Sequence, residues 1–192
     1  LIGIAQSEGD LDINDKTSQY LGQDWSSMSS MQEDSVRVFH HLSMTTGLNE
    51  QYFSCTDDSC LTYKVPAGSR WYYHNAAYNL TKDILEAATN TNHNIYTQQK
   101  IKTPIGMNSG IWLPAGDNDF FYSRARDMAR FGILIANKGV WNGNTILTDT
   151  NYFNQMIGSS QSLNPSYGYL WWLNGKNSII PPGDSLSYPS SL

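Results

Sequence analysis

The stretch from Pro66 to Ala88, PAGSRWYYHNAAYNLTKDILEAA, constrains this chain most, because a turn and an aromatic run lead there into an amphipathic helix. Its apolar residues recur at spacings of three and four: Ala77, Leu80, Ile84 and Ala88. This spacing is typical of one buried helix face. Asn75 is the expected N-cap, since its side-chain oxygen can accept a free N–H of the first turn. Tyr73 and Asn75 then face the same space, where they either form part of an active site or only start the helix.

The composition is that of one folded domain. The chain has 192 residues, enough for a single hydrophobic core, and 40% of them are hydrophobic while 15% are charged. Its net charge is −5 and its sequence contains no cluster of Lys and Arg, which argues against a nucleic-acid-binding protein. No apolar run is long enough for a transmembrane helix. We therefore expect neither a nucleic-acid partner nor a membrane-spanning segment.

Two cysteines, Cys55 and Cys60, lie close together in the segment CTDDSC. They can be two free thiols in a loop, or they can form a disulfide, which is the reading we favour. Metal binding is the least favoured reading, because two thiolates need further ligands and no histidine is near them in sequence. A disulfide across so small a loop would stabilise the fold by about 2 kcal/mol. It would also indicate an oxidising compartment, the periplasm or the cell exterior.

The remaining chain reads as helices first and a strand late. Helical spacing and capping signals predict further helices in five segments: 1–8, 36–42, 93–101, the stretch from Ser123 to just before Gly139, and 152–157. Asn142-Gly143 signals a tight turn, and the stretch from Ile111 to Asp119 reads as a loop.

The best strand candidate is YGYLWWL, from Tyr167 to Leu173, because alternate side chains would point to one face. Asn174-Gly175 then signals a hairpin turn, with Ile179-Ile180 as the start of the return strand. A lone hairpin is marginal in water. We therefore expect this hairpin either to pack on the helices or to belong to a larger sheet.

Several common catalytic motifs are absent from the sequence. It contains no G-x-S-x-G, no P-loop, no G-x-G-x-x-G and no H-E-x-x-H. The four histidines do not lie at the spacing of metal ligands, and the adjacent pair His40-His41 reads as structural. The sequence therefore lacks the nucleophile motif of the α/β-hydrolases and the metal-binding motif of the zincins. We expect no metal site.

Six stretches, in chain order, resemble segments of one enzyme family: LIGIAQSEGDLDINDKTSQYL, VRVFHHLSMTTGL, PAGSRWYYHNAAYNL, IKTPIGM, FFYSRARDMARFGILIANKGVWNGNTIL and YGYLWWLNG. The family is that of the serine β-lactamases and penicillin-binding proteins, in particular the class C β-lactamase-like serine hydrolases. The third stretch carries the family's Y-x-N motif as Tyr73-His74-Asn75. A second Y-x-N, Tyr152 to Asn154, lies outside the matching context and reads as a decoy. The resemblance covers nearly the whole chain.

The resemblance implies a β-lactamase/transpeptidase-like fold of the α/β (α+β) type. It implies mostly the helical domain, over residues 1–160, with a hairpin of the antiparallel sheet in residues 165–182 and the sheet incomplete. We therefore expect 1–192 to be a single partial domain, the middle portion of such a protein.

The chemistry implied by the resemblance is acyl transfer without a cofactor. In the family a serine of an S-x-x-K motif attacks a carbonyl, the lysine or the Y-x-N tyrosine handles its proton, and a K-T-G or H-x-G strand holds the substrate. Tyr73 and Asn75 are the catalytic candidates by this match. No S-x-x-K, K-T-G or H-x-G occurs in the 192 residues, so we expect this chain alone to be inactive. A lactam, an ester or a D-amino-acid amide is the implied substrate of the parent protein.

Two other functions remain open from the sequence. One is a pseudo-enzyme of the same fold, a binding or regulatory module without a nucleophile. The other is an aromatic-rich carbohydrate-binding module, since the chain has six tryptophans that could stack on sugars. Tyr122 and Ser123, at the start of a predicted helix, are further candidates for substrate binding. The resemblance and the cysteines together imply a periplasmic or secreted bacterial protein.

Overall fold

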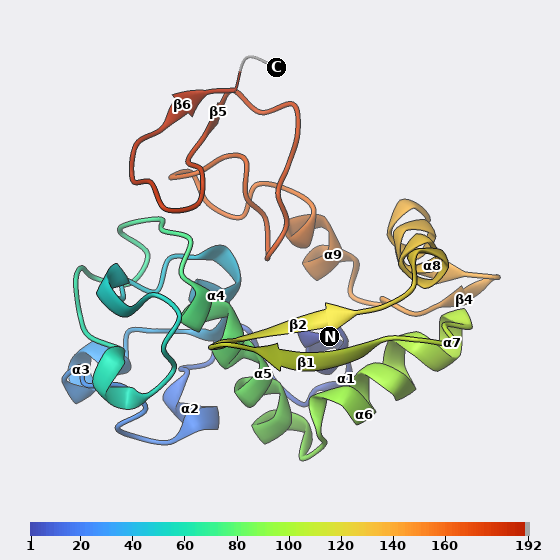
Figure 1. Ribbon diagram of the computed structural model, residues 1–192, viewed down its shortest axis with the longest axis horizontal. Helices are drawn as coiled ribbons and strands as arrows, with labels where there is room; N and C mark the ends of the chain where they lie inside the picture. Colours follow the sequence, from blue (N-terminus) through green and yellow to red (C-terminus); the bar gives the residue numbers. More distant parts are fainter. Residues whose placement is uncertain (191–192) are drawn as a thin grey trace.

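Helix α5 (Asn75–Thr89) is the central element of the computed structural model, which describes residues 1–190. Its neighbours come from both earlier and later parts of the chain: α1 (Ile2–Glu8), α2 (Ser18–Leu21), α4 (Val38–Ser43), α6 (His93–Thr97) and β2 (Asn118–Tyr122). Figure 1 shows the hairpin formed by β1 (Ile111–Ala115) and β2 lying across these helices. The helix that the sequence made central is thus central in space.

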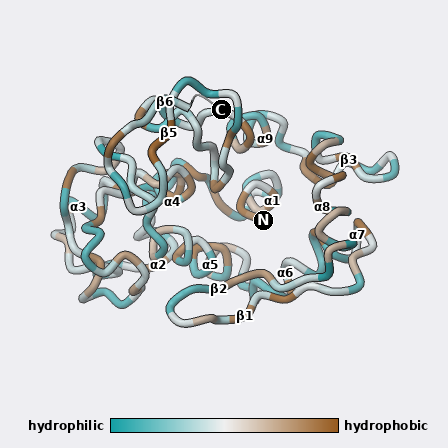
Figure 2. The backbone as a smooth tube through the Cα atoms, turned by 45° about the horizontal axis from the view of Figure 1, so that its top comes forward, coloured by the Kyte–Doolittle hydropathy of each residue, from teal (hydrophilic) through white to brown (hydrophobic). Residues whose placement is uncertain are grey.

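The main hydrophobic core forms where α1, α4, α5 and α8 (Ala125–Ala136) meet. Ile4, Leu42, Ile84 and Leu134 supply one buried side chain from each of these helices. The predicted apolar face of α5 is confirmed, since Ala77, Leu80 and Ile84 are buried. In Figure 2 a hydrophobic stretch runs along α8, while the turn of the β1–β2 hairpin is hydrophilic.

The other elements are short. They are α3 (Ser30–Glu33), η1 (Glu50–Tyr52), η2 (Asp58–Cys60), the π-helical turn η3 (Gln98–Lys102), α7 (Thr103–Ile105), β3 (Val140–Trp141), β4 (Asn144–Thr145), α9 (Thr150–Met156), β5 (Ser178–Ile179) and β6 (Tyr188–Pro189). Within residues 1–190 the strands pair into three separate antiparallel hairpins, β1–β2, β3–β4 and β5–β6. This helix-rich arrangement with an open, C-terminal hairpin confirms the expected α+β class. No helix of the described part has the length and apolar character needed to cross a membrane.

The hairpin β1–β2 corrects the prediction of a loop from Ile111 to Asp119. Its strands are mostly exposed, so their sequence lacks the alternation of buried and exposed residues that signals a strand. Gly116 has a φ of 62°, a value that favours glycine, and it lies in the turn that joins the two strands. The hairpin is held from α5, because Asn79 Nδ2 donates to the Asp117 carbonyl at 2.9 Å.

The stretch from Tyr167 to Leu173 is a tight reversal and not the predicted strand. Tyr167 pairs directly with Trp172 in an isolated antiparallel bridge, and Leu170 lies between them at a φ of 59°. The Leu170 N–H donates to the Leu42 carbonyl at 2.9 Å. The reversal is therefore tied to α4, and the predicted turn at Asn174-Gly175 does not pair it with Ile179. The C-terminal hairpin is instead β5–β6 (Figure 1).

The predicted starts of α5 and α8 are confirmed to within one residue, but the predicted N-cap residues are not the observed ones. His74 is the N-cap of α5, and Asn75 is its first helical residue. Likewise α8 follows Arg124 as its N-cap, one residue after the predicted Ser123. The tight turn at Asn142-Gly143 is confirmed, with φ of 48° and 80° for these two residues.

Candidate active site

The start of α5 is the corner that carries Tyr73 and Asn75. The backbone of His74 is extended, with φ −116° and ψ 110°, and no side chain caps the helix. The Ala76 N–H donates instead to the Phe53 carbonyl at 2.8 Å. Because Asn75 does not serve as the cap, its side chain is available for another partner. Its Nδ2 donates to Ser54 Oγ at 3.1 Å.

His74, between the two candidate residues, has a structural role. Its side chain is 2% exposed, and its Nε2 donates to the Asn49 carbonyl at 3.1 Å. Its Nδ1 is buried without a hydrogen-bond partner in the described part of the chain. Burial lowers the pKa of His74 below 6.5, so the ring is neutral at neutral pH. The neutral ring anchors the backbone between Tyr73 and Asn75 to the loop that contains Asn49.

Tyr73 lies in a cluster of aromatic side chains. Its ring stacks on Trp172, with centroids 5.8 Å apart and planes inclined by 24°. It meets Tyr167 edge-on at 6.2 Å and Tyr78 at 6.3 Å. Tyr167 is fully buried and also contacts the buried Trp71, so the cluster is continuous with the interior. Aromatic packing of this kind fixes the Tyr73 ring in one orientation.

The phenol of Tyr73 is neutral in this environment. Burial raises the pKa of Tyr73 above its usual 10.0. Its hydroxyl has no hydrogen bond from any residue in the range 1–190. A phenolate would need a cation close to the oxygen. The geometry therefore supplies a neutral hydroxyl on a ring that aromatic packing holds in one orientation.

A cavity of about 240 Å³ lies along α5 from Tyr78 to Leu85, and neither Tyr73 nor Asn75 lines it. Its walls are mostly apolar and come from several elements, among them Leu1, Tyr78, Leu85, Phe131, Tyr169 and Trp171. One edge is polar, because Lys82 Nζ donates to Asp119 Oδ2 at 2.6 Å. A second cavity of about 250 Å³ lies toward α8 and shares Leu1 and Phe131 with the first. Such walls suit a substrate or a packed segment that is largely apolar.

Tyr122 and Ser123 lie at the other end of the β1–β2 hairpin. The turn end of the hairpin meets α5, where Tyr78 Oη donates to Asn118 Oδ1 at 3.0 Å. Tyr122 is four residues further along β2, about 13 Å away at strand spacing. Ser123 Oγ lies 3.2 Å from Ser109 Oγ, near the start of α8. The structure therefore places these two residues at the α8 end of the hairpin, away from its contact with Tyr78, and their role in substrate binding stays a prediction.

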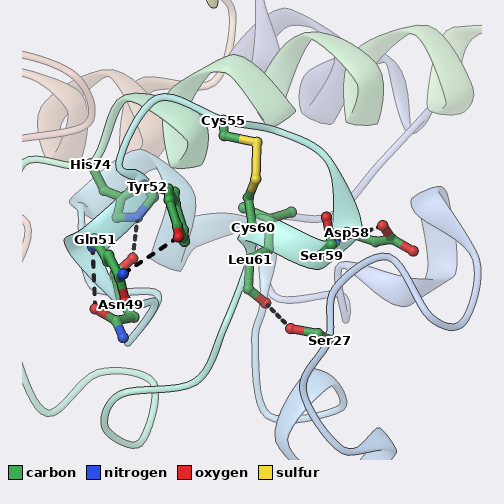
Figure 3. The surroundings of a disulfide bond; sticks show 10 residues. All are labelled: Ser27, Asn49, Gln51, Tyr52, Cys55, Asp58, Ser59, Cys60, Leu61 and His74. Atoms are coloured by element: carbon green, nitrogen blue, oxygen red, sulfur yellow. Dashed lines mark hydrogen bonds between the residues drawn. A yellow bond between two sulfur atoms is a disulfide. The ribbon is translucent and has the colours of Figure 1, made fainter.

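The predicted disulfide between Cys55 and Cys60 is present, with Cα atoms 5.9 Å apart. It closes the short ring from Cys55 to Cys60, and Figure 3 shows Asn49, whose carbonyl accepts from His74, in the segment that leads into this ring. Asp57 lies near the two sulfurs, but these sulfurs are bonded to each other. The disulfide and the Tyr73 corner thus belong to one neighbourhood.

Sequence reasoning missed two residues of this corner. Ser54 contacts the Asn75 amide, and Trp172 stacks on Tyr73. The signal for Ser54 is its position next to Cys55, inside a loop that reads only as polar. Trp172 lies about 100 residues from Tyr73 in sequence, and no local pattern joins the two.

Known structures share this fold at low sequence identity. A protein from Bacteroides dorei described as a beta-lactamase superposes with a TM-score of 0.74 at 18% identity, over 89% of this chain and 61% of that one. The octameric penicillin-binding protein homologue from Pyrococcus abyssi gives 0.66 at 16%, over 88% and 49%. The beta-lactamase/D-alanine carboxypeptidase from Yersinia pestis gives 0.66 at 15%, over 95% and 64%. The chain thus spans about half to two thirds of the length of these relatives.

Sequence comparison identifies the family. No curated protein matches the chain. The family model described as Beta-lactamase, however, matches residues 1–189, almost the full length of the sequence. The match agrees with the order of segments along the chain and with the fold of the structural relatives. The chain belongs to the beta-lactamase family.

Proposed function

We propose that this chain is part of a serine hydrolase that transfers acyl groups from a lactam, an ester or a peptide amide. Tyr73 is the proton-handling phenol of the reaction. Asn75 donates to the substrate through its amide N–H and accepts from a lysine through its carbonyl. The observation that carries the proposal is the corner at the start of α5, where Trp172 stacks on Tyr73 and Ser54 accepts a hydrogen bond from Asn75. Membership of the beta-lactamase family supports the reaction type.

The proposed reaction consists of two successive acyl transfers. A serine oxygen attacks the substrate carbonyl carbon while its proton passes to a base, either lysine or Tyr73 as phenolate. The bond to the leaving group breaks, and the leaving group takes the proton. Water then attacks the acyl-enzyme in the same way and releases the acid. Tyr73 needs the lysine ammonium beside it for this role, because burial alone raises its pKa.

We also expect that the 192 residues alone do not turn over substrate, since they contain no S-x-x-K. The second candidate is a pseudo-enzyme of this fold, which binds ligands without cleaving them. A fluorescent penicillin separates the alternatives. We expect covalent labelling of the whole protein and none of the 192-residue chain. Labelling of this chain would contradict the expected inactivity, and a whole protein that lacks an S-x-x-K and resists labelling would favour the pseudo-enzyme.

The central test of the proposal is Tyr73→Phe in the whole protein. We expect the acylation rate to fall by at least about 100-fold, the usual contribution of a positioned proton-transfer group. The ring remains in its aromatic cluster, so the fold should be unchanged. Tyr63→Phe is the matched control, because Tyr63 is exposed and pairs with Leu48 only through its backbone. Near-normal acylation in Tyr73→Phe would show that another residue handles the proton.

A periplasmic or secreted location is part of the proposal. The Cys55–Cys60 disulfide supports it, because such bonds persist in oxidising compartments. The carbohydrate-binding alternative needs exposed stacking faces. Trp25 and Trp71 are buried, whereas Trp172 is 40% exposed but already stacked on Tyr73. A glycan array with strong hits would favour that alternative over the hydrolase.

A further inference from the structure

We infer that the loop from Asn49 to Cys60, whose last six residues are closed by the Cys55–Cys60 disulfide, holds Asn75 in its orientation, and that Ser54 is the positioning residue that contacts the Asn75 amide. The inference rests on the role proposed above for Asn75 and adds to it the device that sets its side chain. It assigns the Cys55–Cys60 bond a part in the activity that is separate from general stability.

Three consecutive residues at the start of α5 are bonded to this loop. His74 Nε2 donates to the Asn49 carbonyl at 3.1 Å. Asn75 Nδ2 donates to Ser54 Oγ at 3.1 Å, and the Ala76 N–H donates to the Phe53 carbonyl at 2.8 Å. The helix has no side-chain cap of its own. The loop therefore takes the place of the cap, and its position decides the position of Asn75.

Packing does not fix this loop. No residue from Asn49 to Ser59 is buried, and the aromatic side chains of Tyr52 and Phe53 are exposed. A segment without buried side chains opens readily unless other bonds restrain it. Glu50 supplies one restraint, since its carboxylate pairs with Arg70 through two hydrogen bonds at 3.0 Å. That pair lies before Phe53 and does not restrain the second half of the loop, from Phe53 to Cys60.

The disulfide restrains the second half. Cys60 precedes Leu61, which is fully buried and whose carbonyl accepts from the Ser27 N–H at 3.2 Å. Figure 3 shows the bond running from this anchored position to Cys55, at the far side of the loop. Cys55 adjoins Ser54 in sequence. Ser54 is therefore linked to the buried Leu61 through Cys55, the disulfide and Cys60.

The contact with Ser54 leaves the rest of the Asn75 amide free for chemistry. An asparagine has two N–H donors on Nδ2 and an acceptor oxygen. Ser54 takes one donor, so the second N–H and Oδ1 can serve a substrate and a lysine. Without Ser54 the amide would rotate among several orientations. The expected loss is then in the chemical step rather than in substrate binding.

Reduction of the disulfide provides a test of the device. A dithiol reductant gives two electrons and two protons to the Cys55–Cys60 bond, which becomes two thiols, and the reductant becomes a cyclic disulfide. In the reduced whole protein we expect the Ala76 N–H to exchange with deuterium about tenfold faster, because its acceptor sits on the loosened loop. The Ile84 N–H in the same helix should not change. Acylation should slow about fivefold, the size of one lost hydrogen bond.

Variants at Ser54 separate positioning from folding. Ser54→Ala should lower kcat about fivefold with little change in KM, since one neutral hydrogen bond is lost. Ser54→Thr keeps the hydroxyl and should restore most of the rate. Ser59→Ala is the matched control, because Ser59 lies in the same loop and is exposed. Its kcat should equal that of the unmodified protein.

The outcomes distinguish this inference from the proposed function. If Asn75→Ala abolishes acylation while reduction and Ser54→Ala change neither kcat nor Ala76 exchange, the positioning inference is overturned and the function stands. If Asn75→Ala leaves acylation normal, the proposed function fails. Faster Ala76 exchange after reduction would still show that the disulfide sets the start of α5.

Discussion

Tyr73 and Asn75 lie two positions apart, yet the molecule holds them by different means. Tyr73 is held by packing against Tyr167 and Trp172, in a cluster that continues into the core. Asn75 is held by hydrogen bonding to a loop in which no residue before Cys60 is buried. Packing is insensitive to salt and redox state, whereas a tethered polar loop responds to both. The same corner therefore has one robust half and one adjustable half.

The two sides also differ in their ionisable groups. On the core side, His41 is fully buried, its Nδ1 donates to the Ala77 carbonyl at 3.0 Å, and its Nε2 accepts from Thr17 Oγ1 at 2.9 Å. On the loop side, Glu50 is a carboxylate paired with Arg70 and Lys64. A buried neutral ring and a paired carboxylate lose their stabilising effect in different pH ranges. Variants on the two sides should therefore differ in their effects, and three comparisons test this.

The largest expected effect is on the core side. Trp71→Ala should lower the free energy of unfolding by about 3–5 kcal/mol, because it removes a large buried ring from the aromatic cluster. Trp172→Ala, at a ring that is 40% exposed, should cost less than half as much. Urea unfolding of both variants at pH 7 measures the difference. Equal losses would show that the cluster is held at its surface and not from the core.

The second effect is a dependence of stability on pH. Burial lowers the pKa of His41 to about 3, against 6.5 for an unperturbed histidine. Below pH 6.5 the unfolded chain therefore binds a proton that the folded chain does not, and stability falls as the pH falls towards 3. Each histidine kept neutral in this way contributes a slope of about 1.4 kcal/mol per pH unit. His40, whose pKa burial lowers to about 4, adds to the slope down to that value.

His41→Gln tests this assignment, because glutamine can bond to the same carbonyl and hydroxyl without titrating. The variant should lose about 1.4 kcal/mol per pH unit of slope between pH 6 and 4. Urea midpoints in a series of buffers measure it. An unchanged slope would mean that His41 is protonated in the folded protein.

How far the sequence predicted the fold depends on the range of each interaction. Local signals gave α5 with its buried face, the turn at Asn142-Gly143 and the Cys55–Cys60 disulfide. Exposed or tertiary features escaped prediction. The β1–β2 hairpin escaped because both its faces are largely exposed. The Tyr167 reversal escaped because its alternation of apolar residues is also typical of a strand, while the chain turns back at Leu170, which is bonded to Leu42 in α4.

The candidate site was predictable only in part, for the same reason. Tyr73 and Asn75 were located by an ordered set of family segments, and the structure places them at the start of α5 as expected. Their supports were not predictable. Ser54 and Trp172 reach the corner from other parts of the chain, and neither contact leaves a periodic trace in the sequence.

The smallest expected effect is on the loop side, and it is the most direct test of the contrast between Tyr73 and Asn75. Burial raises the pKa of Glu50, but hydrogen bonds from Arg70 and Lys64 outweigh it and lower the pKa to about 2. Because this value lies below 4.5, the pair stabilises the fold above pH 4.5 and loses this effect as the pH falls towards 2. Glu50→Gln should therefore cost below about 1 kcal/mol at pH 7, since the carboxylate is partly exposed and screened.

The Glu50→Gln variant should also show that the loop is coupled to the start of α5 and not to the Tyr73 ring. Deuterium exchange at the Ala76 N–H should quicken, because Glu50 restrains the first half of the loop that provides its acceptor. The Tyr73 ring should be unaffected, since its side chain is held by packing against Trp172 and Tyr167. Asp34→Asn, which breaks an exposed pair with Lys16, is the matched control and should change neither. If Glu50→Gln changed both the near-ultraviolet circular dichroism of the aromatic cluster and the exchange of the Ala76 N–H, Tyr73 and Asn75 would be held as one unit. The contrast between them would then be wrong.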